Sequence, residues 1–298
     1  MDDSALDDMD GYYGIDLEEI AEFQEVMPPQ SLPHGLGGGT LDAPRPAMLL
    51  AASIARGSWR PPSADASRSV PASRWDLDTE WPDSGLAVKR FGAFVDDVEL
   101  FDPALFGIGT QEASAMDAQQ RLVLEGCWEA CAAVLPSDQP PPPAAVAVGI
   151  SYAEYGARAR PHGLSAHSAQ SGTLSVAAGR VSYTLALAGP ALCVDTACSS
   201  ALVALHLCAG SLCAAAPGLA AGVFLGLAPD AVAALARAGM LAPAGRCRTL
   251  DAGADGYARG EACVVHALLP AGGKWGAERG GRALLCVAGS AVNQDGRS

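Results

Sequence analysis

The hydrophobic pattern of the chain alternates short apolar runs with segments of helical periodicity. Continuous apolar runs at 47–55, 144–151, 191–196 and 219–228 predict buried strands. Residues 112–135 instead repeat apolar positions at steps of three and four, which predicts a helix, and 174–187 and the segment after Cys198 also favour helices. Buried strands that alternate with helices are typical of an α/β fold whose strands are mostly internal.

The same pattern suggests three parts along the chain. Residues 1–45 are acidic and rich in Gly and Pro toward their end, so we expect a flexible leader and linker. Residues 46–247 contain the alternating strands and helices. From residue 248 the pattern restarts with two apolar runs, 260–269 and 283–292, and no helix follows them. We therefore expect 248–298 to begin a second α/β half that is C-terminally truncated.

Charge and cysteine content exclude several classes of protein. The net charge is −14, and ten acidic residues with no Lys or Arg occupy positions 1–25, which argues against a nucleic-acid-binding surface and against a secretory or organelle-targeting leader. Residues 196–229 carry no Asp, Glu, Lys or Arg, but Pro217-Gly218 interrupts them, so we expect two buried elements and no membrane span. Nine cysteines without a Cys-x-x-Cys pair indicate a reduced intracellular compartment and no metal site.

One cysteine stands apart from the others. In VDTACSSALVALHLC, residues 194–208, a strand ends and a small polar turn places Cys198 before an apolar helix. Backbone N–H groups at a helix start favour a thiolate and can hold an oxyanion on a thioester carbonyl. The alternative is a structural core cysteine, which we favour for the cysteines in helix or strand patterns: Cys127, Cys131, Cys193, Cys208, Cys213, Cys263 and Cys286.

The segment around Cys198 resembles the active-site signature of β-ketoacyl synthases, specifically the ketosynthase domains of modular polyketide synthases. Further segments resemble this family in the same order: PASRWD at 71–76, GAFVDDVELFDPALFGI at 92–108, EASAMDAQQRLVLEGCWEA at 112–130, AAGRVSYTLALAGP at 177–190, GRCRTLDAGADGYARGEAC at 245–263 and GSAVNQDGRS at 289–298. The acidic DMDGYYG at 8–14 is similar to a motif that precedes ketosynthases in single-domain polyketide synthases of dinoflagellates.

The resemblance implies a thiolase-like fold of five αβαβα layers, with 46–247 as the complete N-terminal half that carries the nucleophile. It implies a decarboxylating Claisen condensation in which Cys198 accepts an acyl group, its backbone N–H forms part of the oxyanion hole, and a malonyl-type thioester attacks. The implied partners are an acyl carrier protein, which supplies phosphopantetheine, and a second copy in a homodimer. No cofactor or metal is implied for the chain itself, and the expected location is the cytoplasm or a plastid.

The chain also departs from the family pattern. Ala118 stands where Pro is usual and Ala262 where Gly is usual. The two histidine motifs of the family are absent, and the five histidines present, His34, His162, His167, His206 and His266, lie in no matching context. We therefore expect that the chain alone does not catalyse condensation. Two alternatives stay open: a non-catalytic acyl-binding or dimerising fragment, and self-acylation at Cys198 followed by slow hydrolysis.

Overall fold

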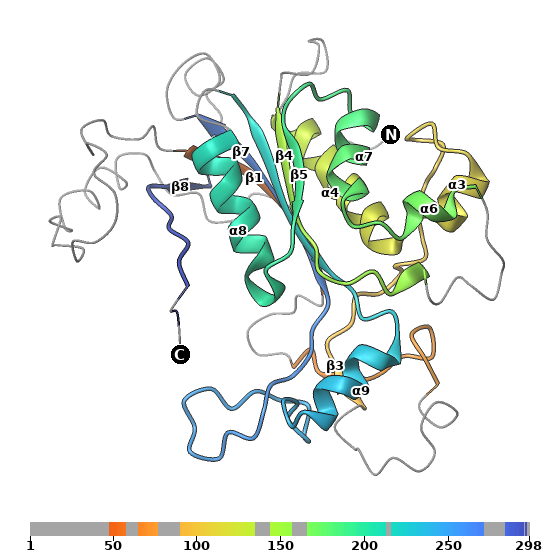
Figure 1. Cartoon of the computed structure of the whole chain (residues 1–298), viewed down its shortest axis with the longest axis vertical. Coiled ribbons are helices and arrows are strands. Elements are labelled where there is room, and N and C mark those ends of the chain that lie inside the picture. Colours follow the sequence, from red (N-terminus) through yellow and green to blue (C-terminus); the bar gives the residue numbers. More distant parts are fainter. Residues whose placement is uncertain are drawn as a thin grey trace, which may run out of the picture.

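A six-stranded mixed sheet forms the centre of the molecule, in the order β5-β4-β6-β7-β1-β8 (Figure 1). The computed structural model describes residues 48–57, 65–76, 90–134, 144–156, 166–212, 216–270, 284–294 and 296, so the expected leader at 1–45 lies outside the described residues. The six strands are β1 (Met48–Gly57), β4 (Ala145–Gly149), β5 (Ala191–Val194), β6 (Gly218–Phe224), β7 (Ala262–Pro270) and β8 (Leu285–Val287). β4 pairs in parallel with both β5 and β6, and the remaining pairs are antiparallel.

Helices cover both faces of this sheet (Figure 1). The described helices are α3 (Thr110–Ala115), α4 (Ala118–Val134), α6 (Ser168–Ser171), α7 (Val176–Thr184), α8 (Ser200–Leu207) and α9 (Pro229–Arg237). α4 and α7 pack on one face, and α8 packs on the other against β4 and β6. Within the described ranges no helix is both long and apolar enough to cross a membrane.

The two faces of the central strands differ in side-chain size. On the α4 face, β4 and β6 contribute Val146, Val148, Leu219, Ala221 and Val223 to the larger core. On the α8 face the same strands present Ala145, Ala147 and Ala220, and Gly149 and Gly222 follow in the same alternation. These small residues let α8 approach closely, because a Cβ on Gly149 would lie 2.5 Å from the Ser200 carbonyl carbon and a Cβ on Gly222 would lie 2.4 Å from the Ala201 Cβ.

The last two strands do not begin a separate layer. β7 lies between β6 and β1 and is antiparallel to both, and β8 pairs with β1 at the sheet edge. Residues 262–270 and 285–287 therefore complete the sheet that carries β4, β5 and β6, and the expectation that residue 248 opens a second half is wrong for these strands. The apolar pattern at 260–269 correctly predicted a buried strand. It could not predict which strands lie beside it, because an apolar strand can be buried next to many neighbours.

The helix predicted at 112–135 is divided in the structure. α3 ends at Ala115, and α4 starts at Ala118 after a short break. The Asp117 carboxylate accepts a hydrogen bond from the Gln119 backbone N–H at 2.8 Å, as expected for a residue that caps a helix start. Asp117 is buried, and burial raises its pKa to about 6.

A smaller region lies at the end of the sheet where β4, β5 and β6 terminate (Figure 1). It comprises residues 65–76, 90–109 and 225–261, with the short strands β2 (Arg68–Ser69) and β3 (Phe91–Gly92) and the helix α9. Its own apolar cluster joins Trp75 to Val232, Ala236 and Leu241. We call this part the end region.

Candidate active site

Cys198 lies in the turn that the sequence predicted, between β5 and α8. The turn Ala197–Ser199 forms one 3-10 turn, and α8 continues from Ser200. Cys198 is exposed, while Ser200 is buried beneath it. Because Gly149 and Gly222 allow the start of α8 to sit directly on β4 and β6, the turn is held at the carboxyl end of the sheet with its thiol accessible.

The residue before Cys198 has a left-handed backbone. Ala197 has a φ of 54°, which costs a non-glycine residue roughly 1–2 kcal/mol. The Asp195 carboxylate accepts a hydrogen bond from the Ala197 N–H at 2.9 Å. On the following residues, the Ser199 hydroxyl contacts the Thr196 carbonyl at 2.9 Å and the Thr196 Oγ1 at 2.8 Å. Polar side chains of the turn thus stabilise a conformation that is strained by itself.

The serines that surround this turn were not predicted from the sequence. The Ser200 Oγ accepts from the Thr196 N–H at 2.8 Å and donates to the Ala197 carbonyl at 2.8 Å. The Ser151 Oγ, just past β4, lies 3.2 Å from the Ser200 Oγ and 3.4 Å from the Ala197 carbonyl oxygen. The sequence offered one signal, since Ser151 and Asp195 follow adjacent parallel strands, whose carboxyl ends meet at one edge.

The segment after β4 connects the Cys198 turn with the loop after β6. Tyr152 packs edge-on against Phe224, with ring centroids 5.7 Å apart. Two residues later, a single oxygen of the Glu154 carboxylate accepts from the N–H groups of Leu227 at 2.8 Å and Ala228 at 2.9 Å. Burial raises the pKa of Glu154, and these two N–H groups oppose the rise.

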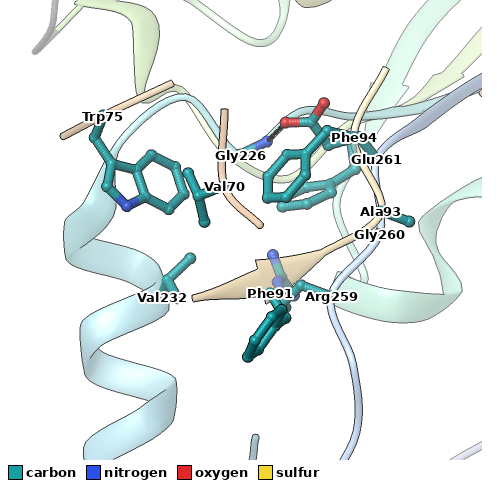
Figure 2. A pocket seen from close by; sticks show the side chains of 11 residues that line it. Val70, Trp75, Phe91, Ala93, Phe94, Gly226, Val232, Arg259, Gly260 and Glu261 are labelled. Atoms are coloured by element: carbon teal, nitrogen blue, oxygen red, sulfur yellow. Dashed lines mark hydrogen bonds between the residues drawn. The ribbon is translucent and has the colours of Figure 1, made fainter. Parts of the chain in front are cut away.

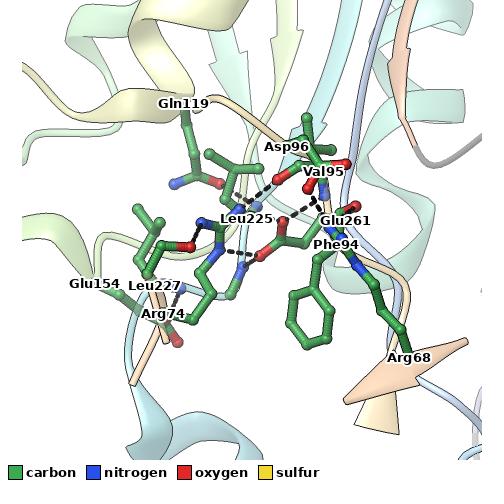
Figure 3. Close-up of polar contacts among 12 residues, drawn as sticks. Arg68, Arg74, Phe94, Val95, Asp96, Gln119, Glu154, Leu225, Leu227 and Glu261 are labelled. Atoms are coloured by element: carbon green, nitrogen blue, oxygen red, sulfur yellow. Dashed lines mark hydrogen bonds and ion pairs between the residues drawn. The ribbon is translucent and has the colours of Figure 1, made fainter. Parts of the chain in front are cut away.

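A buried ion pair connects the same loop with other segments of the end region (Figure 3). The Arg74 guanidinium binds both carboxylate oxygens of Glu261, at 2.8 and 2.7 Å, and both side chains are 2% exposed. Glu261 also accepts from the N–H groups of Val95 at 2.9 Å and Gly226 at 3.1 Å. Since every carboxylate oxygen has partners, the pair joins three segments without leaving an unpaired charge.

An aromatic pocket lies in the end region, apart from the Cys198 turn (Figure 2). It is lined by Trp75, Phe91, Phe94, Phe224 and Arg259, among others. The Arg259 guanidinium stacks on Phe224, 4.2 Å from the ring centroid. Its lining includes no residue of the turn 195–200, so it adds no group to the surroundings of the thiol.

The described histidines do not surround Cys198. His206 lies two turns along α8, and its Nδ1 is 2.8 Å from the Ser290 Oγ. His266 lies in β7 opposite Ser53 and Ala220, where burial lowers its pKa. His167 precedes α6, and His34 and His162 lie outside the described residues.

The cysteines predicted to be structural are buried or partly buried wherever the structure describes them. Burial raises the pKa of Cys127, of Cys193 and, to about 11, of Cys131. Cys208 and Cys263 are buried and Cys286 is partly buried, whereas Cys213 lies outside the described residues. Among the cysteines described, only Cys198 and Cys247 are exposed. Within the described part of the chain, no three His, Cys, Asp or Glu side chains gather as a metal site.

Comparisons with known proteins identify the family of the chain. The family model "Beta-ketoacyl synthase, N-terminal domain" matches residues 62–271. The chain is 43% identical over 247 residues to a phenolphthiocerol/phthiocerol polyketide synthase of Mycobacterium tuberculosis, which covers 78% of the chain and 16% of that protein. It is also 43% identical over 248 residues to polyketide synthase GfsB of Streptomyces halstedii, covering 78% of the chain and 4% of the relative. The chain therefore spans only a small part of the length of these relatives.

Solved ketosynthases share the fold. The ketosynthase from module 6 of the Bacillus subtilis bacillaene synthase matches with a TM-score of 0.63 and 30% identity, over 74% of this chain and 40% of that one. The oxazolomycin ketosynthase domain of Streptomyces albus matches with a TM-score of 0.64 and 28% identity, over 75% of this chain and 42% of the other. The predicted thiolase-like α/β fold is confirmed, and the chain belongs to the β-ketoacyl synthase family of polyketide synthases.

Proposed function

We propose that Cys198 is the acyl-accepting nucleophile of a β-ketoacyl synthase of polyketide or fatty-acid type. The observation that carries the proposal is the exposed thiol in a strained turn between β5 and α8, together with the backbone N–H of the same residue. Among the described residues no acceptor is found for the Cys198 N–H. A nucleophile and a hydrogen-bond donor for a developing oxyanion are thus adjacent.

The proposed first step is acyl transfer from the phosphopantetheine thioester of an acyl carrier protein. The Cys198 thiolate attacks the thioester carbonyl, and the carbonyl oxygen becomes an oxyanion that accepts a hydrogen bond from the Cys198 N–H. The C–S bond to the pantetheine then breaks, its thiolate leaves and takes up a proton, and the acyl group stays on Cys198. The exposed position of the thiol supports access for such a long substrate arm.

The proposed second step is the decarboxylating condensation. A malonyl-type thioester loses CO2, the resulting carbanion attacks the acyl-cysteine carbonyl, and the Cys198 thiolate leaves as the β-ketoacyl product forms. Negative charge develops on the extender's thioester oxygen, and stabilising it needs further donors. His206 and His266 lie elsewhere, on α8 and β7, so we propose that residues 1–298 alone carry out acyl transfer and not condensation.

The partners follow from this chemistry. We propose an acyl carrier protein that brings the phosphopantetheine arm, a homodimeric assembly as in the family, and no cofactor or metal held by the chain itself. The proposed location is a reducing intracellular compartment, cytoplasm or plastid, where the exposed Cys198 and Cys247 thiols stay free.

Mass spectrometry of the intact chain after incubation with an acyl-carrier-protein thioester tests the proposal. We expect one acyl adduct on the wild type and none on Cys198→Ala. Cys247→Ala is the matched control, because Cys247 is the other exposed cysteine described and should not affect uptake. An adduct that survives in Cys198→Ala and is lost in Cys247→Ala would overturn the assignment.

A further inference from the structure

The peptide group between Ala197 and Cys198 is held from its carbonyl side by three donors. The Ala197 carbonyl oxygen accepts from the Ser200 N–H and from the Ser200 Oγ at 2.8 Å. The Ser151 Oγ lies 3.4 Å from the same oxygen and 3.2 Å from the Ser200 Oγ. The Ser200 N–H bond belongs to the 3-10 turn, whereas the two hydroxyl contacts are additional to it.

The shorter contact favours the Ala197 carbonyl as the acceptor of the Ser200 proton, at 2.8 Å against 3.2 Å to the Ser151 Oγ. The Thr196 N–H donates to the Ser200 Oγ at 2.8 Å, so this oxygen is an acceptor there. Its own proton is then free to point at the Ala197 carbonyl. Ser200 is 4% exposed, which keeps water from competing for either bond.

A peptide group is planar and trans, so its N–H points away from its C=O. When the serines hold the Ala197 carbonyl on the buried side, the N–H of Cys198 is directed to the opposite side, where no described residue accepts it. The Asp195 carboxylate holds the other side of Ala197 through its N–H at 2.9 Å. Hydrogen bonds to a carbonyl also polarise the N–H of the same peptide, because bonds in a chain strengthen one another.

We propose that Ser200, assisted by Ser151, is a positioning residue that orients and polarises the Ala197–Cys198 peptide so that the Cys198 N–H serves as an oxyanion donor. The inference rests on the proposed acyl transfer at Cys198. Ser200 touches neither the acyl group nor the sulfur and acts through the peptide it binds. The sequence had indicated no role for the two serines after Cys198 beyond their small size.

Two reactions of the Cys198 thiol distinguish positioning of the Cys198 N–H by Ser200 from a general loss of order in the turn. Alkylation by iodoacetamide forms an S–C bond with loss of iodide and develops no oxyanion. Acylation by hexanoyl-N-acetylcysteamine passes through an oxyanion that the Cys198 N–H would stabilise. We expect Ser200→Ala in the 298-residue chain to slow acylation about 10- to 100-fold, less than the roughly 100- to 1,000-fold seen when an oxyanion donor is lost outright. Alkylation should change less than about threefold, with an unchanged pH profile, because the thiol itself is untouched.

Ser199→Ala is the control for a general loosening of the turn, since the Ser199 hydroxyl binds Thr196 and not the Ala197 carbonyl. Any change in its two rates should affect acylation and alkylation alike. Ser151→Ala is the second variant in case Ser200→Ala unfolds, and it should lower only acylation, by about two- to fivefold, because its contact is longer. Equal losses in both reactions of Ser200→Ala or Ser151→Ala, or unchanged acylation in either variant, would overturn the inference. If the wild type is alkylated at Cys198 but never acylated, the proposed function fails as well, and the alkylation arm identifies that outcome.

Discussion

The Cys198 turn and the Arg74–Glu261 pair are two polar networks built on opposite principles. The turn gathers neutral groups and one carboxylate from residues 195–200 and Ser151, and it leaves its thiol exposed. The ion pair joins residues 187 positions apart, and both charges are 2% exposed (Figure 3). The first network orients a few atoms at the surface, whereas the second holds segments of the end region together. Changes in the turn should therefore alter chemistry, and changes in the ion pair should alter stability.

The largest effect on chemistry is expected from Cys198→Ser. The hydroxyl is nearly the same size as the thiol but far less ionised near neutral pH, so we expect acyl uptake to fall at least about 100-fold. The melting temperature should stay close to that of the wild type, because Cys198 is exposed. A loss of stability comparable to that of an ion-pair variant would contradict the separation between the two networks.

The largest effect on stability is expected from Glu261→Gln. The change leaves the buried Arg74 charge without its partner, which costs about 3–5 kcal/mol of unfolding free energy, measured by urea denaturation. The control is Asp96→Asn, which breaks the exposed Arg68–Asp96 pair and should cost about 0–1 kcal/mol. Similar losses of unfolding free energy in the two variants would show that burial does not make the Arg74–Glu261 pair more stabilising than the exposed pair.

The next effect is the pH dependence of stability that comes from Asp117, a buried carboxyl that belongs to neither network. Burial raises the pKa of Asp117 from 3.8 to about 6, so the folded chain holds this proton over a range in which the unfolded chain has lost it. Stability from this group is therefore present below about pH 4 and is lost as pH rises to about 6, a change of roughly 3 kcal/mol. Asp117→Asn should remove this part of the pH dependence in unfolding experiments between pH 4 and 7. A variant with the same pH slope as the wild type would refute the assignment.

The smallest effect compares two glycines. In Gly149→Ala the new Cβ would lie 2.5 Å from the Ser200 carbonyl carbon, so α8 must shift, at a cost of about 1–3 kcal/mol and with slower acylation of Cys198. Gly179→Ala, on the exposed side of α7 with no atom within 4 Å, should instead stabilise the chain by about 0.5–1 kcal/mol. Thermal unfolding and acylation rates of both variants test this, and a tolerated Gly149→Ala would mean that α8 is not held on β4.

Much of this molecule was predictable from local pattern. The apolar runs at 47–55, 144–151 and 191–196 became β1, β4 and β5. β4 is buried throughout, as its pattern predicted, whereas β5 lies at the sheet edge and is exposed or partly buried. The turn that presents Cys198 was also predictable, because small polar residues between an apolar strand and an apolar helix leave few other arrangements. The core cysteines followed from their place in helix and strand patterns.

Only the tertiary structure decided which distant groups meet. The apolar pattern at 260–269 reports burial but not that β7 lies between β6 and β1, because strand pairing depends on the whole sheet. Similarly, nothing near Glu261 in the sequence points to Arg74. The contact of Ser151 with the Cys198 turn depends on β4 and β5 being neighbours in the sheet. Hydrophobic periodicity is a property of neighbours along the chain, whereas the partners of a carboxylate or a hydroxyl are chosen by packing. The sequence by itself therefore located the proposed nucleophile, and the fold alone determined which side chains hold the peptide group beside it.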